Sequence, residues 1–495
     1  MHDTTPGGPH APHAVVVGAG PVGLWTAGEL ALAGVRTTLL EQTGRRSENS
    51  KALGLLPRTL EVLALRGALG PVLTAGRPLP RWHFGMLETL LDFQQLDTPY
   101  PFMLSVPQTV TESVLEQRAL DLGVEIQRDT AFRDLQQTAD EVLVTTERDG
   151  RTTQLRADLL VGADGARSGV RAAAGIAFPG EPSSNWGFLG DVHLTEPPPP
   201  GFRRRSPEGA LIVAPLPDGT FRVTGWDPEH QDRDEELDLE TLRATTVRIA
   251  GADFGMHDPR WLSRFGDANR LAATYRAGRV LLAGDAAHVH WPTGGLGLNA
   301  GLQDAMDLGW RAAAFLHGTA PASTLDRYGD ERHDYGQELR RSTLAQGALI
   351  RARTPAEVAT REVVDGFLRS PEGNAHTAGS VSCIDLAYAR GDGDDPLVGR
   401  RCPLPVGDPA ALAEFLDLFM PGELVLLSTT PEQIAAVGVP STTGRLPADV
   451  AARLGATAVV VRPDGHIAWA SRGTGAITDA DVRAALVASG ALLPR

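Results

Sequence analysis

The amino-acid sequence predicts an α/β protein whose N-terminal domain is a Rossmann-like, nucleotide-binding unit. Near the N-terminus an apolar strand, a glycine-rich turn, a helix and a second strand follow one another, which is the order of a βαβ unit. Two later apolar strands are each followed at once by an Asp/Gly pair. A chain of 495 residues is too long for one hydrophobic core, so we expect two or three domains.

The βαβ unit is contained in HAVVVGAGPVGLWTAGELALAGVRTTLLEQ. Residues 14–17 are small and β-branched, which is typical of a buried parallel strand. Residues 18–23 read GAGPVG and match GxGxxG, residues 24–33 have the pattern of a helix, and residues 35–40 that of a second strand. The glycine motif alone is a weak signal, but between a strand and a helix it is a strong indication of dinucleotide binding.

Each glycine of this motif has a physical reason. Gly18 permits the tight turn, Gly20 lets the backbone approach a pyrophosphate, and Gly23 lets the helix pack closely on the strand. The helix N-terminus offers free N–H groups and the positive end of its dipole to the phosphates. Glu41 ends the second strand, where a carboxylate accepts hydrogen bonds from a ribose diol, so FAD or NAD is favoured over NADP.

Two distant segments carry the later Asp/Gly pairs. ADLLVGADG contains Asp164 and Gly165, and RVLLAGDAAH contains Gly284 and Asp285, which a turn-rich loop and a helix over about 299–315 follow. Either pair alone has an ordinary explanation, since Asp-Gly is a common turn and Gly-Asp can cap a helix.

Together and in this order, the three motifs resemble those of FAD-dependent aromatic hydroxylases of the para-hydroxybenzoate hydroxylase type. The chain is similar to the longer members, which hydroxylate aromatic polyketides and phenols, and the resemblance covers almost all of it. The cofactor-binding residues that the resemblance implies are Gly18, Gly20, Gly23, Glu41, Lys51, Gln108, Asp164, Gly165, Gly284, Asp285, Gly295, Gly297, Leu298 and Asn299.

The resemblance places the PTGGLGLN loop, residues 292–299, against the isoalloxazine ring of the flavin. Backbone N–H groups at a helix N-terminus would stabilise negative charge on the reduced flavin, and glycines would let the ring approach. Trp291 stands where the family usually has a second proline, and Leu296 where a glutamine or lysine is more common. No catalytic side chain is assigned; within the loop the suspected catalytic positions are Pro292, Gly294 and Gly295.

Lys51, in SENSKALGLLPRTLEV, is the only lysine in the chain. A strong arginine bias explains its rarity but not its position. The stretch resembles a family segment whose first arginine faces the FAD pyrophosphate, with lysine in that place. Lysine supplies the charge without the bidentate fork of arginine. We therefore expect Lys51 to bind the pyrophosphate, or to retune the movement of the flavin.

The resemblance implies a Rossmann-like FAD-binding domain, an inserted β-sheet substrate-binding domain and a C-terminal thioredoxin-like domain. A hairpin is expected at 211–225, with its turn at 217–219. The last domain lacks CxxC, so we expect a structural role, in packing or in a homodimer contact. The expected limits are 1–12 for a flexible tail, 13–76, 105–180 and 275–375 for the FAD-binding domain, 77–104 and 181–274 for the substrate-binding domain, and 376–495 for a linker and the thioredoxin-like domain.

Aromatic residues of the two substrate segments are candidates for the substrate pocket, although core packing is the commoner role of any single one. His288 and His290 lie near the flavin loop, where packing or capping explains them as well as acid–base work does. The candidates are Trp82, Phe84, Phe93, Phe102, Trp226 and Trp291.

The activity implied by the resemblance is hydroxylation of a polyketide-like or phenolic aromatic substrate with NADH or NADPH and O2, through a flavin C4a-hydroperoxide, as in antibiotic biosynthesis. Baeyer–Villiger oxygenation of a polyketide shares the same motifs and stays open. A flavin-dependent halogenase is disfavoured because its Trp-x-Trp-x-Ile-Pro segment is missing. A non-catalytic scaffold is disfavoured because all three cofactor motifs are complete.

The composition restricts partners and location. A net charge of −15 disfavours nucleic acid and anionic membranes as partners. Cys383 and Cys402 have no metal-ligand spacing and form no CxxC, so we expect neither a metal site nor a disulfide framework. The first 13 residues lack the pattern of a signal peptide, and the longest apolar run is interrupted by glycines and Glu29. A cytoplasmic enzyme is expected.

Overall fold

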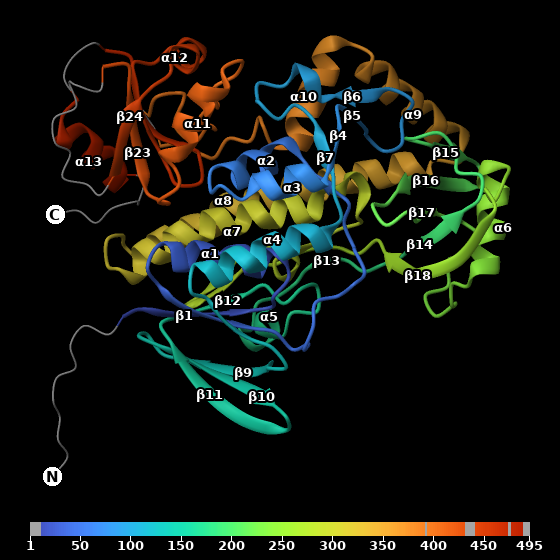
Figure 1. Ribbon diagram of the computed structural model, residues 1–495, viewed down its shortest axis with the longest axis horizontal. Coiled ribbons are helices and arrows are strands. Elements are labelled where there is room, and N and C mark those ends of the chain that lie inside the picture. Colours follow the sequence, from blue (N-terminus) through green and yellow to red (C-terminus); the bar gives the residue numbers. More distant parts are fainter. Residues whose placement is uncertain (1–10, 392–393, 431–440, 474–476, 489–495) are drawn as a thin grey trace.

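The computed structural model describes residues 11–391, 394–430, 441–473 and 477–488. Three parts can be followed in Figure 1. A six-stranded sheet is covered by a layer of long helices. A five-stranded sheet (green) lies at one side of this layer, and a four-stranded sheet near the C-terminus (orange to red) lies at the opposite side.

The six-stranded sheet is built from the strands that the motifs predicted. β1 (His13–Val17) pairs in parallel with β2 (Arg36–Leu40) and with β12 (Leu159–Gly162), which pairs in parallel with β21 (Val280–Leu282). These four strands are almost entirely buried, as expected for parallel strands covered on both faces. The edge strands are β8 (Glu125–Gln127) and β20 (Arg276–Ala277).

Four helices form the covering layer. α1 (Pro21–Leu32) starts directly after the glycine turn and packs on α4 (Gln108–Asp121) and α7 (Leu296–Leu316), and α8 (Ser323–Arg351) packs on α7. Among the residues that the structure describes, no helix is long and apolar enough to cross a membrane. The shorter helices of this part are α2 (Pro57–Ala64), α3 (Leu69–Ala75), α5 (Gly169–Ala173), α9 (Pro355–Leu368) and α10 (Pro371–Ser382).

The five-stranded antiparallel sheet has the order β15 (Arg203–Ser206), β16 (Gly209–Pro215), β17 (Phe221–Trp226), β14 (Trp186–Leu194) and β18 (Met256–Gly266). The hairpin expected around 217–219 is confirmed as β16–β17. One face of the sheet packs its apolar side chains on α6 (Leu239–Ala250).

The other face of this sheet is turned towards the helix layer. Leu189 is paired with Thr224, and Asp191 with Arg222, so these four side chains share one face because side chains alternate along a strand. Arg222 Nη1 donates to the carbonyl of Lys51 at 3.5 Å, so this face of the sheet contacts the segment after β2.

Smaller strand groups and turns complete this part of the chain. They are β3 (Gly54–Leu55), β4 (Arg77–Leu79) and β7 (Met103–Ser105); β5 (Arg81–His83) and β6 (Leu90–Asp92); β9 (Ala131–Gln137), β10 (Val142–Arg148) and β11 (Arg151–Ala157); β13 (Gly180–Glu181), β19 (Asn269–Leu271) and β22 (His288–Val289); and the 3-10 turns η1 (Phe93–Gln95), η2 (Gly284–Ala286) and η3 (Thr293–Gly295).

The C-terminal part has a mixed sheet in the order β24 (Ser441–Arg445), β23 (Leu424–Ser428), β25 (Ala458–Val461) and β26 (Ile467–Ser471). β23 and β24 are parallel, and the other pairs are antiparallel. The linker expected from residue 376 is wrong in its first residues, which belong to α10, because the Ser370 side chain caps this helix and it continues to Ser382. The other helices are α11 (Pro409–Asp417), α12 (Ala448–Leu454) and α13 (Asp479–Ala488).

Buried charges join the C-terminal part to the helix layer. Arg462, in the turn before β26, lies 2.9 Å from Asp307 on α7 and 3.0 Å from Glu331 on α8. Arg311, one turn further along α7, lies 2.8 Å from both acids. Removing one member of such a group leaves an uncompensated charge in the interior. These ion pairs therefore fix the C-terminal part against α7 and α8.

Candidate cofactor and substrate site

The glycine turn between β1 and α1 contains two packed glycines and one open one. Gly18 has a φ of 103°, and a Cβ there would lie 2.4 Å from the Ala163 carbonyl oxygen. A Cβ at Gly23 would lie 1.8 Å from the Gly18 carbonyl oxygen. Around Gly20, by contrast, no heavy atom of the described residues lies within 4 Å of where a Cβ would be. The turn therefore has open space beside the position expected to face a pyrophosphate.

Glu41 lies at the end of β2, beside this turn. One carboxylate oxygen accepts a hydrogen bond from the backbone N–H of Ala19 at 2.9 Å, and the other from the N–H of Thr43 at 2.9 Å. The carboxylate is therefore fixed next to the N-terminus of α1. α1 begins at Pro21, directly after Gly20, without a side-chain cap, so the N–H groups that follow Pro21 in its first turn are available to an anion.

The segment that contains Lys51 runs across the N-terminus of α4. The backbone N–H of Gln108 donates to Ser50 Oγ at 2.8 Å, and the N–H of Ala52 donates to Gln108 Oε1 at 3.2 Å. The N–H of Gln108, the first residue of α4, is therefore already bonded to this segment. Lys51 itself is exposed, so its ammonium lies at the surface beside a second helix N-terminus.

Lys51 brings positive charge to two carboxylates. Burial raises the pKa of Asp285, while His288 and Lys51 act to lower it. Burial likewise raises the pKa of Glu112 on α4, and the positive charge of Lys51 acts to lower it. Asp285 is nevertheless open to solvent. Asp285 is thus open to solvent but has protein close around it, with Lys51 near enough to act on its charge. The region bordered by Asp285, Lys51 and the N-terminus of α4 is called the recess below.

The loop before α7 adopts the conformation that its glycines permit. Gly294 and Gly295 have φ values of 72° and 75°, in the left-handed region, and α7 starts after Gly295 without a side-chain cap. A Cβ at Gly295 would meet no heavy atom of the described residues within 4 Å. At Gly297, a Cβ would lie 3.3 Å from His290 Nε2, so packing against His290 explains this glycine.

Asn299 holds the loop to β3. Its Oδ1 accepts from the N–H of Leu56 at 2.7 Å, and its Nδ2 donates to the carbonyls of Gly54 at 3.0 Å and Gly295 at 2.7 Å. The side chain is fully engaged in these contacts. Asn299 therefore shapes the site through the backbone it holds.

Asp304 on α7, which the motifs do not include, fixes the Gly-Asp turn. Its Oδ2 accepts from the N–H of Gly284 at 3.0 Å and lies 2.7 Å from His288 Nε2, and its Oδ1 accepts from Arg332 Nε at 2.6 Å. Burial acts to raise the pKa of Asp304, but Arg332 and His288 lower it to about 2. An acid on the buried face of the predicted helix 299–315 is the sequence signal that could have revealed it.

Asp164 supports the N-terminus of α5, whose N-cap is Ser168, rather than presenting a free carboxylate. It accepts from Ser168 Oγ at 2.5 Å and from the N–H of Val170 at 3.1 Å. Gly165 follows with a φ of 83° and open space at its Cβ position. Arg171 of α5 donates to the Ala286 carbonyl at 2.8 Å, which ties the Asp-Gly turn to the Gly-Asp turn.

Trp291 is buried and takes part in a support between the loop and the five-stranded sheet. The Arg351 guanidinium lies 4.5 Å from the Trp291 ring centre, and its Nη1 lies 3.4 Å from Asp267. Asp267 accepts from the N–H groups of Ser184 and Asn185 at 2.8 Å. The chain enters the five-stranded sheet after residues 184–185 and leaves it before residue 267. Through Arg351 and Asp267, Trp291 therefore helps to position this sheet.

The remaining candidates for substrate contact lie in three different parts of the structure and do not form one pocket wall. Trp226 is buried on the sheet face that is turned towards the helix layer, opposite Gly187. Phe93 is fully buried in a cluster that also contains Leu296 of the loop, and Trp82 and Phe84 pack against it. Phe102 packs instead against the core of the six-stranded sheet.

Comparisons with known proteins agree with this arrangement. The chain matches the FAD binding domain family over residues 12–343 and the family described as aromatic-ring hydroxylase, C-terminal, over residues 395–489. An uncharacterized aromatic compound monooxygenase of Bacillus subtilis is 42% identical over 92% of this chain and 94% of that protein. A dialkyldecalin synthase of Streptomyces rugosporus is 37% identical over 92% and 95%.

The structure of an anhydrotetracycline hydroxylase from Streptomyces rimosus superposes with a TM-score of 0.84 at 37% identity, over 96% of this chain and 98% of that one. Both family matches and the overall structural likeness cover the parts that form the recess and the C-terminal sheet. The chain belongs to the family of FAD-dependent aromatic-ring hydroxylases.

Proposed function

We propose that this protein is a monooxygenase that binds FAD in the recess and hydroxylates a polycyclic aromatic substrate of polyketide type, with NADH or NADPH and O2. The observation that carries the proposal is the open space at Gly20 and Gly295, directly before α1 and α7, with the Glu41 carboxylate fixed beside the first turn and Asp285 within the influence of the chain's one lysine. Such a site suits an elongated ligand with a pyrophosphate and an anionic ring. The similarity to an anhydrotetracycline hydroxylase supports the polycyclic substrate.

The residues of the recess suit FAD. Gly20 and Gly295 leave open space at their Cβ positions, where the pyrophosphate and the flavin ring are expected. Lys51 would pair with the pyrophosphate, Glu41 with a ribose, and Asp285 with hydroxyls of the ribityl chain or ribose. When bound, FAD would supply electron transfer from the nicotinamide and activation of oxygen.

The substrate would lie between the loop before α7 and the sheet face that carries Leu189, Thr224 and Ser263. The hydroxyl of Thr224 donates to the Phe188 carbonyl at 2.8 Å, so it offers no free donor to this space. A surface of this kind favours a planar, largely apolar ring system. The protein's contribution is then to orient the ring and exclude water.

The C-terminal part has the strand order of a thioredoxin-like domain, with one parallel and two antiparallel pairs. We infer that it is such a domain without redox chemistry. The Arg462 contacts to α7 and α8 support a structural role. The expected homodimer contact stays a prediction.

A cyclisation without net oxidation is a second candidate, because one similar solved structure, 33% identical over 96% of this chain, is that of a Diels-Alderase. Consumption of reduced nicotinamide and of oxygen separates the two functions. The first experiment therefore measures the absorbance of the purified protein in the flavin bands, and then NADPH and NADH oxidation with anhydrotetracycline as the probe substrate. We expect bound FAD, oxidation that the probe stimulates, and a product with one added oxygen atom.

A colourless protein that binds no added FAD would contradict the proposal. So would conversion of the probe without consumption of NADPH, NADH or oxygen, which would favour the cyclisation. NMR assignment of the product distinguishes ring hydroxylation from a Baeyer–Villiger insertion.

Replacement of Lys51 tests the pyrophosphate contact. Lys51→Ala should weaken FAD binding roughly 10- to 100-fold, because a hydrogen bond to a charged group contributes about 1.5–3 kcal/mol. Lys51→Arg should bind FAD close to the wild-type level. The measurement is the dissociation constant of FAD for the apoprotein, with thermal unfolding of the apoprotein as a check on the fold. Equal affinity of Lys51→Ala and wild type would refute the contact.

A matched pair of glycine substitutions separates ligand binding from packing. Gly20→Ala should leave the stability of the apoprotein unchanged, because the backbone there is extended and the Cβ has open space, yet it should reduce FAD affinity. Gly23→Ala should destabilise the apoprotein itself, since its Cβ would lie 1.8 Å from the Gly18 oxygen. Denaturant unfolding of apoprotein and titration with FAD give the two quantities. The interpretation fails if Gly20→Ala binds FAD like wild type.

A further inference from the structure

A cavity of about 350 Å³ lies at the edge strand β15 of the five-stranded sheet, on the side that is next to α9 in Figure 1. This volume is within the usual range of small-molecule sites. Its lining combines apolar side chains with charged ones. The lining residues that matter here are Met86, Glu88, Pro199, Phe202, Arg203 and Arg205.

Two arginines of β15 reach this cavity from the same face of the strand. Arg203 and Arg205 are two residues apart, so their Cα atoms are about 7 Å apart and their side chains share one face. Both side chains are half-buried, whereas Arg204, between them, is exposed and points to the opposite face. A single anion between Arg203 and Arg205 can therefore contact both guanidinium groups.

These two guanidinium groups form no ion pair with a carboxylate of the described residues. Arg203 Nη2 donates to the Glu88 carbonyl at 3.0 Å, and Arg205 Nε donates to the Ile350 carbonyl at 3.3 Å. A guanidinium has five N–H groups, so most of them stay free for a ligand. Burial lowers the pKa of Arg205, although Glu357 acts to raise it. An anion in the cavity would offset the solvation that Arg205 loses through burial.

A third arginine, Arg361 of α9, fixes the wall of the cavity at Met86. Arg361 is buried and donates to the carbonyls of Gly85 and Met86, which have φ values of 55° and 51°. A methionine in this left-handed region is strained, so the contacts of Arg361 hold it in place. Burial and the charge of Arg205 lower the pKa of Arg361 to about 10. The wall is therefore preformed, and it has a further positive charge behind it.

The apolar side of the lining is fixed by contacts of its own. The N–H of Phe202 donates to the Pro199 carbonyl at 3.1 Å, and the Phe202 carbonyl accepts from the N–H of Val213 at 3.0 Å. The ring of Phe202 lies edge-on to that of Phe254, with 5.3 Å between the ring centres. The cavity thus offers a rigid apolar surface beside two cations.

Packed side chains separate this cavity from the sheet face proposed for the aromatic substrate. In the strand register, Ile212 stands between Arg203 and Thr224. Met86 and Ile350 belong to one apolar cluster, against which Ile212 packs. The cavity and the proposed substrate face are therefore two different sites.

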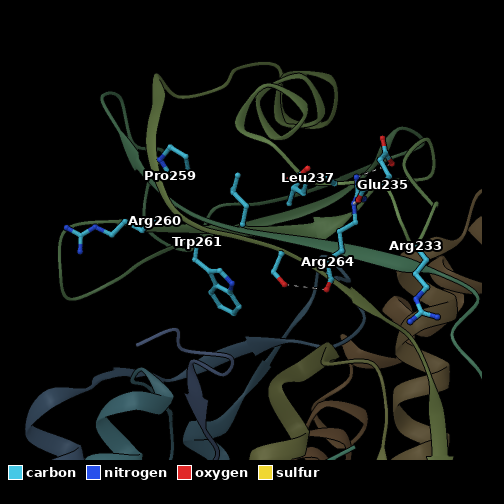
Figure 2. Close-up of a pocket in the computed structure, with 10 residues that line it drawn as sticks. Arg233, Glu235, Leu237, Pro259, Arg260, Trp261 and Arg264 are labelled. Atoms are coloured by element: carbon cyan, nitrogen blue, oxygen red, sulfur yellow. Dashed lines mark hydrogen bonds and ion pairs between the residues drawn. The ribbon is translucent and has the colours of Figure 1, made fainter. Parts of the chain in front are cut away.

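The opposite edge of the sheet has a second cavity with arginines, of about 440 Å³ beside β18, but it does not bring them together. Figure 2 shows Arg233 and Arg260 at opposite ends of its lining. Arg264, near its middle, is already paired with Glu235 at 3.1 Å. Of these two cavities, only the one at β15 has two cations that one ligand can share.

We propose that the cavity at β15 binds an organic acid with an apolar body, whose carboxylate lies between Arg203 and Arg205. Hydrogen bonds between guanidinium and carboxylate groups are charge-assisted and commonly bidentate. The apolar body would lie against Met86, Pro199 and Phe202. Inorganic phosphate is a poorer match, because it would leave this apolar surface without a contact. The site lies apart from the recess, so it goes beyond the proposed function and does not depend on it.

The test measures the binding of octanoate to the purified full-length protein by isothermal titration calorimetry. Octanamide, which has no charge, and inorganic phosphate, which has no apolar body, should each bind at least tenfold more weakly. Arg203→Gln/Arg205→Gln should raise the dissociation constant of octanoate about tenfold or more, because the charge-assisted contacts are lost. Glu88→Gln should lower it, because a carboxylate that lines the cavity repels the anion.

The matched control is Arg204→Gln, which removes the same charge from the same strand but on the opposite face, and which should bind octanoate like the wild type. Arg203→Gln alone is the milder variant, and thermal unfolding checks that each variant folds. Octanoate that does not bind the wild type, or that binds the arginine variants as tightly as Arg204→Gln, would overturn the site. Phosphate that binds as tightly as octanoate would overturn the organic acid.

A second titration, with anhydrotetracycline present, separates this site from the substrate space. We expect the affinity for octanoate to be unchanged. Competition between the two compounds would place the acid in the substrate space and would also overturn the site. A protein that binds octanoate as expected but takes up no FAD would contradict the proposed function alone.

Discussion

Buried charges fix helix α7 to its neighbours, and the geometry of the recess depends on where this helix begins. Near its N-terminus, Asp304 holds the Gly284 N–H, His288 and Arg332. Further along, Asp307 and Arg311 meet Arg462 and Glu331. Both sets of charged side chains are buried. Removing one partner of a buried ion pair leaves an uncompensated charge and lowers the free energy of unfolding. The buried charges thus fix the position of α7, and with it the C-terminal end of the loop at residues 292–299.

The start of α7 is one of several helix N-termini in the described residues that no side chain caps. α1 and α7 begin without side-chain caps, as do α2, α3 and α8, whereas Ser168 and Asp238 cap α5 and α6. Uncapped N–H groups have a cost unless water or a ligand satisfies them. The N-termini of α1 and α7 adjoin the open space at Gly20 and Gly295. In the proposed function their backbone dipoles, together with Lys51, would face the anionic parts of FAD.

The sequence predicts the local features of this fold well, because they depend on neighbours in the chain. The strands at 14–17 and 280–283 and the helix at 299–315 are found within a few residues of their expected positions. Contacts between distant segments are not predicted. Arg462 has the pattern of a turn residue, yet it is buried against α7.

The chemical reasons assigned to individual residues are predictable to different degrees. Gly18 and Gly23 have the packing roles that the motif implies, and Gly20 has open space beside it. Gly297 is explained by His290, and Asn299 by the backbone groups it binds, which only the three-dimensional structure reveals. A helix as long as α8 is not evident from its mostly polar sequence, because its buried residues are widely spaced.

The anchoring of α7 by the C-terminal part is tested most directly by hydrogen exchange in Arg462→Met, compared with Arg472→Met, where Arg472 is 52% exposed and pairs with Asp395 away from α7. The account predicts a loss of about 3–5 kcal/mol of unfolding free energy in Arg462→Met, because buried acids lose their partner, and at most about 1 kcal/mol in the control. It also predicts faster amide exchange in both α7 and the strands β23, β25 and β26. Exchange in α7 that is unchanged and equal in the two variants would contradict the account.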